Sequence, residues 1–290
     1  MTFDPVPVLA LGAALCSASA TIFIRQGLRG SDPYTGFWIN CMVGAAGMWI
    51  VVLLTGGVGP VSGRSLLLFS AAGLIGTAGG RLSRFLAIEK VGAAVASAVG
   101  NLTPLIATVL AIALLGEHVT LPILTGTIVI VGGTLLLSGS GQQIGFRPWM
   151  ILLPLASATC FGIVQIIRKV ALAGMAPAPG AAVNYTAALI AVSAVMLARD
   201  HRGIYACRGR ALVNFIAAGV AENTGVFLII LALSHGTVSV VIPLTAASPI
   251  FVLLFTPFFL KGVEVLTPRV IVGTLLIVAG VYLITALAGR

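Results

Sequence analysis

The chain is 290 residues long, and 59% of its residues are hydrophobic while only 8% are charged. A soluble domain carries about 25% charged residues, so this chain has too few charges to cover a water-soluble fold of its size. The composition excludes a soluble enzyme, a disordered chain and a nucleic-acid-binding module, and leaves an integral membrane protein. The formal net charge of +9 is then explained by membrane topology and contact with anionic lipids.

Long continuous apolar runs, such as 95–115 and 271–284, predict transmembrane helices, and no run shows the alternation of a barrel strand. We therefore expect an all-α polytopic membrane protein with ten transmembrane helices. The first run has no Lys or Arg ahead of it and is expected to be a retained helix, not a signal peptide. The predicted spans, in chain order, are 6–25, 34–54, 66–87, 91–115, 120–138, 149–168, 181–198, 211–233, 237–260 and 268–288.

An internal repeat divides the chain into two halves, 1–143 and 144–290. Each half contains five predicted helices, and because five is odd the second half enters the bilayer from the opposite side. Inverted repeats of this kind commonly build transporters that alternate access around a site between the halves. At a shift of 145 residues identical residue types recur at Ala87, Val95, Pro104 and Leu115, and at a shift of 147 they recur at Glu117, Thr120, Gly126, Thr127 and Gly133.

Each half carries a proline in its fourth helix, a Glu-x-x-Thr turn and a Gly-rich last helix. The residues are Pro104, Glu117, Thr120, Gly126 and Gly133, and then Pro249, Glu264, Thr267, Gly273 and Gly280. Over nearly the whole chain this pattern resembles the EamA-type members of the drug/metabolite transporter superfamily. The resemblance implies a secondary transporter, not an enzyme, that sits in the cell (inner) membrane and exports small metabolites. Length and composition are similar to those of the aromatic amino acid exporters within it, while exchange of phosphorylated sugars and export of drugs or cations are the alternatives.

Three prolines are predicted to act as hinges for alternating access. Pro104 and Pro249 occupy matching positions in the fourth and ninth helices, and Pro243 adds a second break in the ninth. Proline removes a backbone donor and kinks a helix, although the kinks could equally serve static packing. Glycines on the fifth and tenth helices predict a closely packed scaffold. These glycines are Gly126, Gly132, Gly133, Gly273 and Gly280.

Charged side chains inside membrane spans are costly and usually mark function. Glu222 is the one acidic residue expected at the middle of a span, whereas Arg81 and Arg84 lie one turn apart in the third span. In the repeat Glu222 falls on Thr77, one turn from Arg81, so the third and eighth helices are expected to face each other. We assign the substrate carboxylate to Arg81 and an ammonium group or a coupling proton to Glu222. The alternative is a structural ion pair, with Arg84 extending to the interface.

Other polar and aromatic side chains in the spans are candidates for the transport pathway. A serine among them could instead bond its hydroxyl to the backbone of its own helix, and a tryptophan could instead belong to an interfacial belt. The candidates are Ser17, Trp38, Asn101, Tyr185 and Asn223, with Ser19 and Gln165.

Enzyme motifs and metal-ligand spacings are absent from the sequence, so we expect no catalytic residue, no metal and no cofactor. The four cysteines are scattered and are interpreted as packing residues. The expected partners are a small-molecule substrate and the lipid bilayer, with no nucleic acid, and the chain is expected to be a monomer. The rival classes are a polytopic membrane enzyme acting on a lipid-linked substrate and a passive channel.

The basic residues are distributed unevenly between the two sides of the predicted bundle. Ten lie in the connections after the odd-numbered helices and four on the opposite side, Arg168 and Lys169 among those four. The positive-inside rule then places both termini outside the cytoplasm, whereas the family resemblance implies that both are cytoplasmic.

Overall fold

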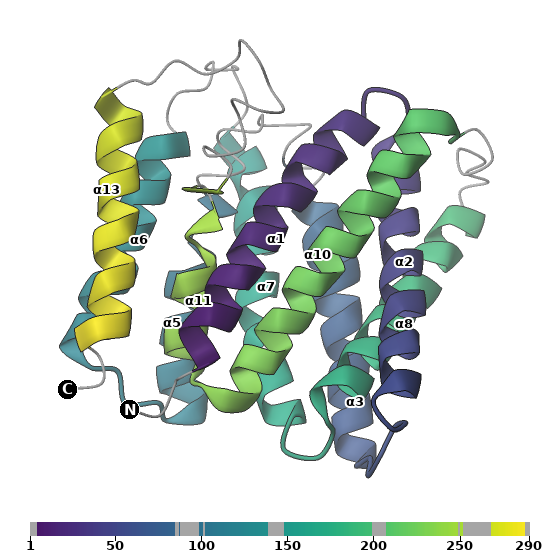
Figure 1. The fold of residues 1–290 in the computed structure, drawn as a ribbon, viewed down its shortest axis with the longest axis horizontal. Coiled ribbons are helices and arrows are strands. Elements are labelled where there is room, and N and C mark those ends of the chain that lie inside the picture. The colour runs from purple at the N-terminus through teal and green to yellow at the C-terminus, as the bar shows by residue number, and fades with distance from the viewer. Residues whose placement is uncertain are drawn as a thin grey trace.

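The computed structural model describes residues 5–84, 87, 99–100, 102–138, 148–198, 207–248, 250–251 and 268–287. Every element in these ranges is helical, and the helices lie side by side in one bundle (Figure 1). The elements are α1 (Pro5–Gly27), α2 (Pro33–Leu54), α3 (Gly63–Ala72), η1 (Gly73–Gly80), α5 (Thr103–Leu115), α6 (Leu121–Ser138), η2 (Pro148–Ile151), α7 (Leu152–Ala171), α8 (Pro177–Ala198), α10 (Gly209–His235), α11 (Val238–Thr245), α13 (Pro268–Tyr282) and η3 (Leu283–Leu287).

Six described helices are long and apolar enough to cross a membrane, and three further apolar helices are shorter. Each of the six overlaps an expected span. The largest difference is at α8, which begins at Pro177 where the sequence predicted 181, because prolines in a first helical turn lose no hydrogen bond. The fourth and ninth expected spans fall partly outside the described residues, so the number ten stays a prediction.

The second helix of each half shows the repeat most clearly. Pro33–Leu54 and Pro177–Ala198 are both 22 residues long and begin with a proline, and a shift of 144 superposes their ends. The two helices pack along each other, with α10 against the other side of α2 (Figure 1). Polar residues at equal depth in α2 and α8 are therefore brought to equivalent places in the bundle.

The third membrane-crossing helix contains a π-helical stretch, η1, that is rich in glycine. A Cβ at Gly76 would lie 2.6 Å from Val164 Cγ2 of α7, so the backbone approaches α7 more closely than any larger residue permits. At the end of the stretch the Ser157 hydroxyl donates to the Gly80 carbonyl at 2.9 Å. Single π-helical turns are frequent at functional sites. Here η1 draws Thr77 inward, where it is buried.

The last helices of the two halves, α6 and α13, form the predicted scaffold at one edge of the bundle (Figure 1). A Cβ at Gly126 would lie 2.8 Å from the Gly280 carbonyl oxygen, and one at Gly133 would lie 2.6 Å from the Gly273 carbonyl oxygen. The small-residue contact is confirmed at these positions. It is wrong for Gly132, whose Cβ would meet nothing within 4 Å.

Of the three prolines predicted as hinges, the structure describes Pro104 and Pro243, and of these two only Pro243 lies in the interior of a helix. Pro104 lies in the first turn of α5, after a turn at Leu102, so it begins a helix where the sequence predicted an internal break. Such a position favours proline, because a backbone N–H in the first turn of a helix would have no carbonyl acceptor within that helix. Pro243 lies inside α11, which ends two residues later at Thr245. Pro249 lies outside the described residues.

Candidate functional site

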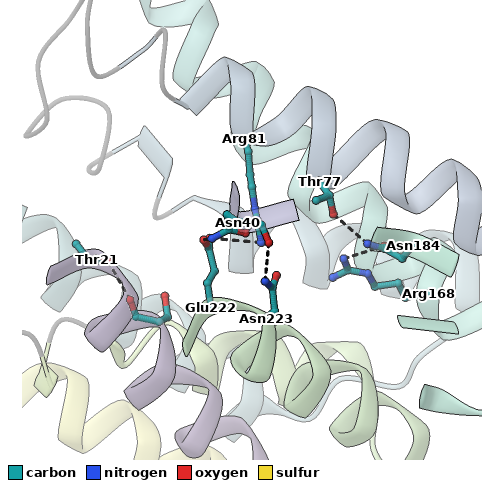
Figure 2. A network of polar contacts seen from close by, with 9 residues as sticks. Thr21, Asn40, Thr77, Arg81, Arg168, Asn184, Glu222 and Asn223 are labelled. Carbon is teal, nitrogen blue, oxygen red and sulfur yellow. Dashed lines mark hydrogen bonds and ion pairs between the residues drawn. The ribbon is translucent and has the colours of Figure 1, made fainter. Parts of the chain in front are cut away.

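Arg81 and Glu222 meet at the centre of the bundle, as the sequence predicted for the third and eighth helices. Arg81 Nη2 lies 3.4 Å from Glu222 Oε1. Asn40 of α2 joins the pair, since its Oδ1 accepts from Arg81 Nη1 at 2.6 Å and its Nδ2 donates to Glu222 Oε2 at 2.7 Å (Figure 2). An asparagine amide carries both an acceptor and a donor, so it closes a three-membered polar cluster.

Asn223, the neighbour of Glu222, holds Asn40 in place. Its Nδ2 donates to the backbone carbonyl of Asn40 at 2.9 Å, while its Oδ1 has no hydrogen-bond partner in the described part of the chain. The approach requires a glycine in α2, because a Cβ at Gly44 would lie 2.8 Å from the Asn223 side chain. Asn40 and Asn223 are themselves buried.

The two charged partners differ in exposure. The Arg81 side chain is 9% exposed and the Glu222 side chain is 19% exposed. A buried ion pair is stable only when its geometry and hydrogen bonds offset desolvation, and Asn40 supplies those hydrogen bonds here. Glu222 is thus the more exposed partner of the pair.

A second polar cluster lies beside the first and is built around Arg168. Arg168 Nη2 donates to Asn184 Oδ1 at 3.1 Å, and Asn184 Nδ2 donates to Thr77 Oγ1 at 3.0 Å (Figure 2). The assignment of Arg168 to a connection was wrong. Helix α7 continues to Ala171, and Arg168 is buried within it at 4% exposure.

Tyr185 lies between the two clusters. Its side chain is fully buried, and its hydroxyl lies beside the Arg81 guanidinium without forming a hydrogen bond of full geometry in the described part of the chain. Tyr185 directly follows Asn184 of the second cluster in α8. Its ring packs in an apolar cluster with Phe69. A buried hydroxyl without a partner is costly, so this group is a candidate for interaction with a ligand.

The remaining predicted site residues do not join these clusters. Trp38 Nε1 donates to Ser193 Oγ at 2.9 Å and so ties α2 to α8. Ser17 is exposed and its carbonyl accepts from Thr21, whereas the Ser19 hydroxyl bonds Leu15 of its own helix, which is the alternative that we gave for serine.

Three further positions complete the comparison with the sequence. Gln165 is buried and its Oε1 lacks a partner among the described residues. Arg84 is exposed, in agreement with the alternative given for it. Asn101 lies outside the described residues. Within the described ranges, no group of three or more His, Cys, Asp or Glu side chains could hold a metal ion.

Sequence reasoning missed four residues of the two clusters: Asn40, Thr77 as a contact, Arg168 and Asn184. One signal could have found the asparagines. They lie 144 residues apart, at equal depth in two helices of equal length. A polar residue repeated inside two apolar helices at the repeat spacing is a candidate for a shared role.

The chain matches a family model described as the EamA-like transporter family over two stretches, 5–139 and 148–286. A comparison with curated proteins finds no match. A solved crystal structure superposes with a TM-score of 0.84, covers 100% of this chain and 99% of its own, and is 18% identical in sequence. At this identity the similarity establishes the fold alone.

Proposed function

Because the chain belongs to the EamA-like transporter family, we propose that it is a secondary transporter of the cell (inner) membrane that exports amino acids, aromatic ones included, by alternating access. The observation that supports a zwitterionic substrate is the buried cluster of Arg81, Asn40 and Glu222. Ionised groups at the centre of a membrane bundle are retained at a cost and usually serve transport. Both halves of one chain supply the cluster, so the proposed transporting unit is a monomer.

Glu222 is the proposed binding group for the substrate ammonium. Its Oε1 contact with Arg81, at 3.4 Å, is the longest in the cluster, whereas Asn40 holds the other carboxylate oxygen at 2.7 Å. An ammonium group can therefore replace Arg81 at Oε1 while Asn40 keeps Glu222 oriented. An aromatic substrate body would then pack near Tyr185, where rings can stack offset.

Alternating access is proposed to use the repeat-matched prolines Pro104 and Pro249, together with Pro243. The described part of this arrangement supports movement near helix ends. Pro104 starts α5 directly after a turn, and α11 ends two residues after Pro243. Hinges are commonly a few residues at the ends of elements.

Counterflow into proteoliposomes tests the proposal with a panel of amino acids, cationic drugs and phosphate esters. We expect counterflow for amino acids, with Glu222→Gln and Arg81→Gln each below about a tenth of the wild-type rate. Arg84→Gln is the matched control, because this exposed arginine lies one turn from Arg81, and it should stay within about twofold of wild type. Counterflow of phosphate esters or drugs without amino acids would establish one of the alternatives instead.

A further inference from the structure

The repeat relates two of the three residues in each polar cluster. The arginines are not related by it, since Arg81 follows η1 in the third helix whereas Arg168 lies in α7, the first helix of the second half. Asn40 and Asn184 are separated by the 144 residues that superpose α2 on α8. In each cluster the asparagine accepts from an arginine and donates to a third residue, which is Glu222 in the first and Thr77 in the second. Glu222 and Thr77 are themselves repeat equivalents, at a shift of 145. Thr77 thus occupies the place where the second cluster would otherwise hold a carboxylate.

The charges of the two clusters do not balance. Two buried guanidinium groups, Arg81 and Arg168, lie in neighbouring clusters, and Glu222, which pairs with Arg81, is the one carboxylate that the described residues bring to either cluster. Arg168 is 4% exposed, and its Nε has no hydrogen-bond partner in the described ranges. An uncompensated buried charge is strongly destabilising, so an anion bound here would be favoured.

We propose that Arg168 and Tyr185 bind the carboxylate group of the substrate. This carboxylate would lie beside Thr77, which stands where the first cluster has the carboxylate of Glu222. This inference rests on the proposed function and adds the substrate class. A guanidinium presents paired donors that match the two oxygens of a carboxylate, and Arg168 has free donor capacity at Nε. Tyr185 follows Asn184, the residue bonded to Arg168, and its buried hydroxyl has no acceptor among the described residues, so it supplies a further donor.

The carboxylate is therefore assigned to Arg168 instead of Arg81. Arg81 stays bonded to Asn40 and has Glu222 beside its other terminal nitrogen, whereas the Nε of Arg168 has no hydrogen-bond partner in the described ranges. A carboxylate bound here gives Arg168 a partner of opposite charge, while the zwitterion as a whole leaves the net charge of the two clusters unchanged. A phosphate dianion would leave an excess negative charge next to Glu222, and an amine without a carboxylate would add to the positive charge. Because Arg168 is buried, the carboxylate reaches it when the bundle opens during alternating access.

The test compares L-phenylalanine with phenethylamine, its decarboxylated amine, and with phenylacetate, its deaminated relative. Binding to the purified full-length chain is measured by ligand-induced thermal stabilisation. We expect Arg168→Gln to weaken binding of phenylalanine and phenylacetate at least about tenfold and to change phenethylamine binding less than about twofold. Arg168→Lys should recover part of the loss, because it keeps the charge. Equal losses for all three ligands, or no loss, would overturn the proposal.

Lys169→Gln is the matched control. This lysine neighbours Arg168 in α7, but its ammonium donates to the backbone carbonyls of Leu233 and Gly236, each at 2.7 Å. Its replacement should leave the ratio of phenylalanine to phenethylamine affinity unchanged, and a changed ratio would contradict the assignment to Arg168.

A second variant keeps the proposal testable if Arg168→Gln does not fold. Thr77→Asp supplies an internal carboxylate beside Asn184 and Arg168, and should weaken phenylalanine and phenylacetate binding while sparing phenethylamine. Unchanged carboxylate binding in this variant would overturn the proposal.

The experiments distinguish failure of the proposed function from failure of the carboxylate site. Absence of amino acid counterflow with carboxylate-dependent stabilisation intact would reject the proposed function alone, and counterflow that persists in Arg168→Gln would reject the carboxylate site alone.

Discussion

Asn40 and Asn184 occupy equivalent positions in the two halves of the chain, and each holds a buried arginine through its side-chain oxygen. The distances are 2.6 Å from Arg81 Nη1 and 3.1 Å from Arg168 Nη2. In both cases the amide nitrogen donates onward, to Glu222 in one cluster and to Thr77 in the other. The repeat therefore extends to the asparagine and to the group that it donates to, a carboxylate in one cluster and a hydroxyl in the other, while the two arginines come from helices that the repeat does not relate.

The ion pair of Arg81 and Glu222 should behave as a unit. Each of Arg81→Met and Glu222→Gln leaves one uncompensated buried charge and should lower the free energy of unfolding by about 3–5 kcal/mol. The double variant removes both charges and keeps an amide that can accept from Asn40, so it should be more stable than either single variant. Thermal unfolding of the four purified forms in detergent measures this. Additive losses would show that the two residues are not coupled.

Gly44 of α2 should tolerate no side chain, because it faces Asn223. A Cβ there would lie 2.8 Å from the Asn223 carboxamide, which holds Asn40. We expect Gly44→Ala to lower stability by about 1–3 kcal/mol and to reduce substrate binding. Gly47→Ala is the control on the same helix, since its Cβ would meet nothing within 4 Å. Equal unfolding temperatures for the two variants would contradict the close contact.

Two adjacent glycines of α6 should differ in the same way, because only one of them contacts α13 closely. Gly133→Ala places a methyl group 2.6 Å from the Gly273 carbonyl oxygen and should separate the helices, whereas Gly132→Ala meets nothing within 4 Å. We expect a loss of about 1–3 kcal/mol for the first and an unchanged or slightly raised stability for the second. Thermal unfolding of both variants decides between this contact and a looser one.

Glu117, in the Glu-x-x-Thr turn of the first half, caps the N-terminus of α11 in the second. Its two carboxylate oxygens accept from the backbone of Val238 at 2.8 Å and of Ser239 at 3.0 Å, and from the Ser239 hydroxyl at 2.7 Å. Glu117→Ala leaves two backbone donors without their acceptor and should cost about 1–3 kcal/mol. Ser239→Ala keeps both backbone bonds and should cost less. A larger loss for Ser239→Ala in the same melting assay would refute the capping role.

Pro104→Ala separates the hinge from a packing role. Proline in the first turn of a helix loses no hydrogen bond, so alanine there should change stability by less than about 1 kcal/mol. If Pro104 serves as a hinge, the counterflow rate should fall several-fold at unchanged unfolding temperature. A lower unfolding temperature with an unchanged rate would assign the proline to packing.

The sequence by itself determined the class, the helices and the repeat of this protein. Hydropathy is a local property, and a run of about 20 apolar residues can be satisfied in lipid only as a helix. The expected spans therefore agree with helices such as α2 and α8 to within a few residues. The repeat also placed Arg81 opposite Glu222, because symmetry relates the helices that carry them.

The tertiary structure alone decided which polar groups meet. Arg168 ends an apolar run, and hydropathy cannot distinguish an interfacial arginine from one that a longer helix turns into the bundle. Asn40, Asn184 and Thr77 look unremarkable in sequence, since short polar side chains usually bond their own helix. Their roles follow from the rotation and depth of each helix, which depend on close contacts such as that between Gly76 and Val164. These contacts join residues more than 80 positions apart, so no local pattern encodes them.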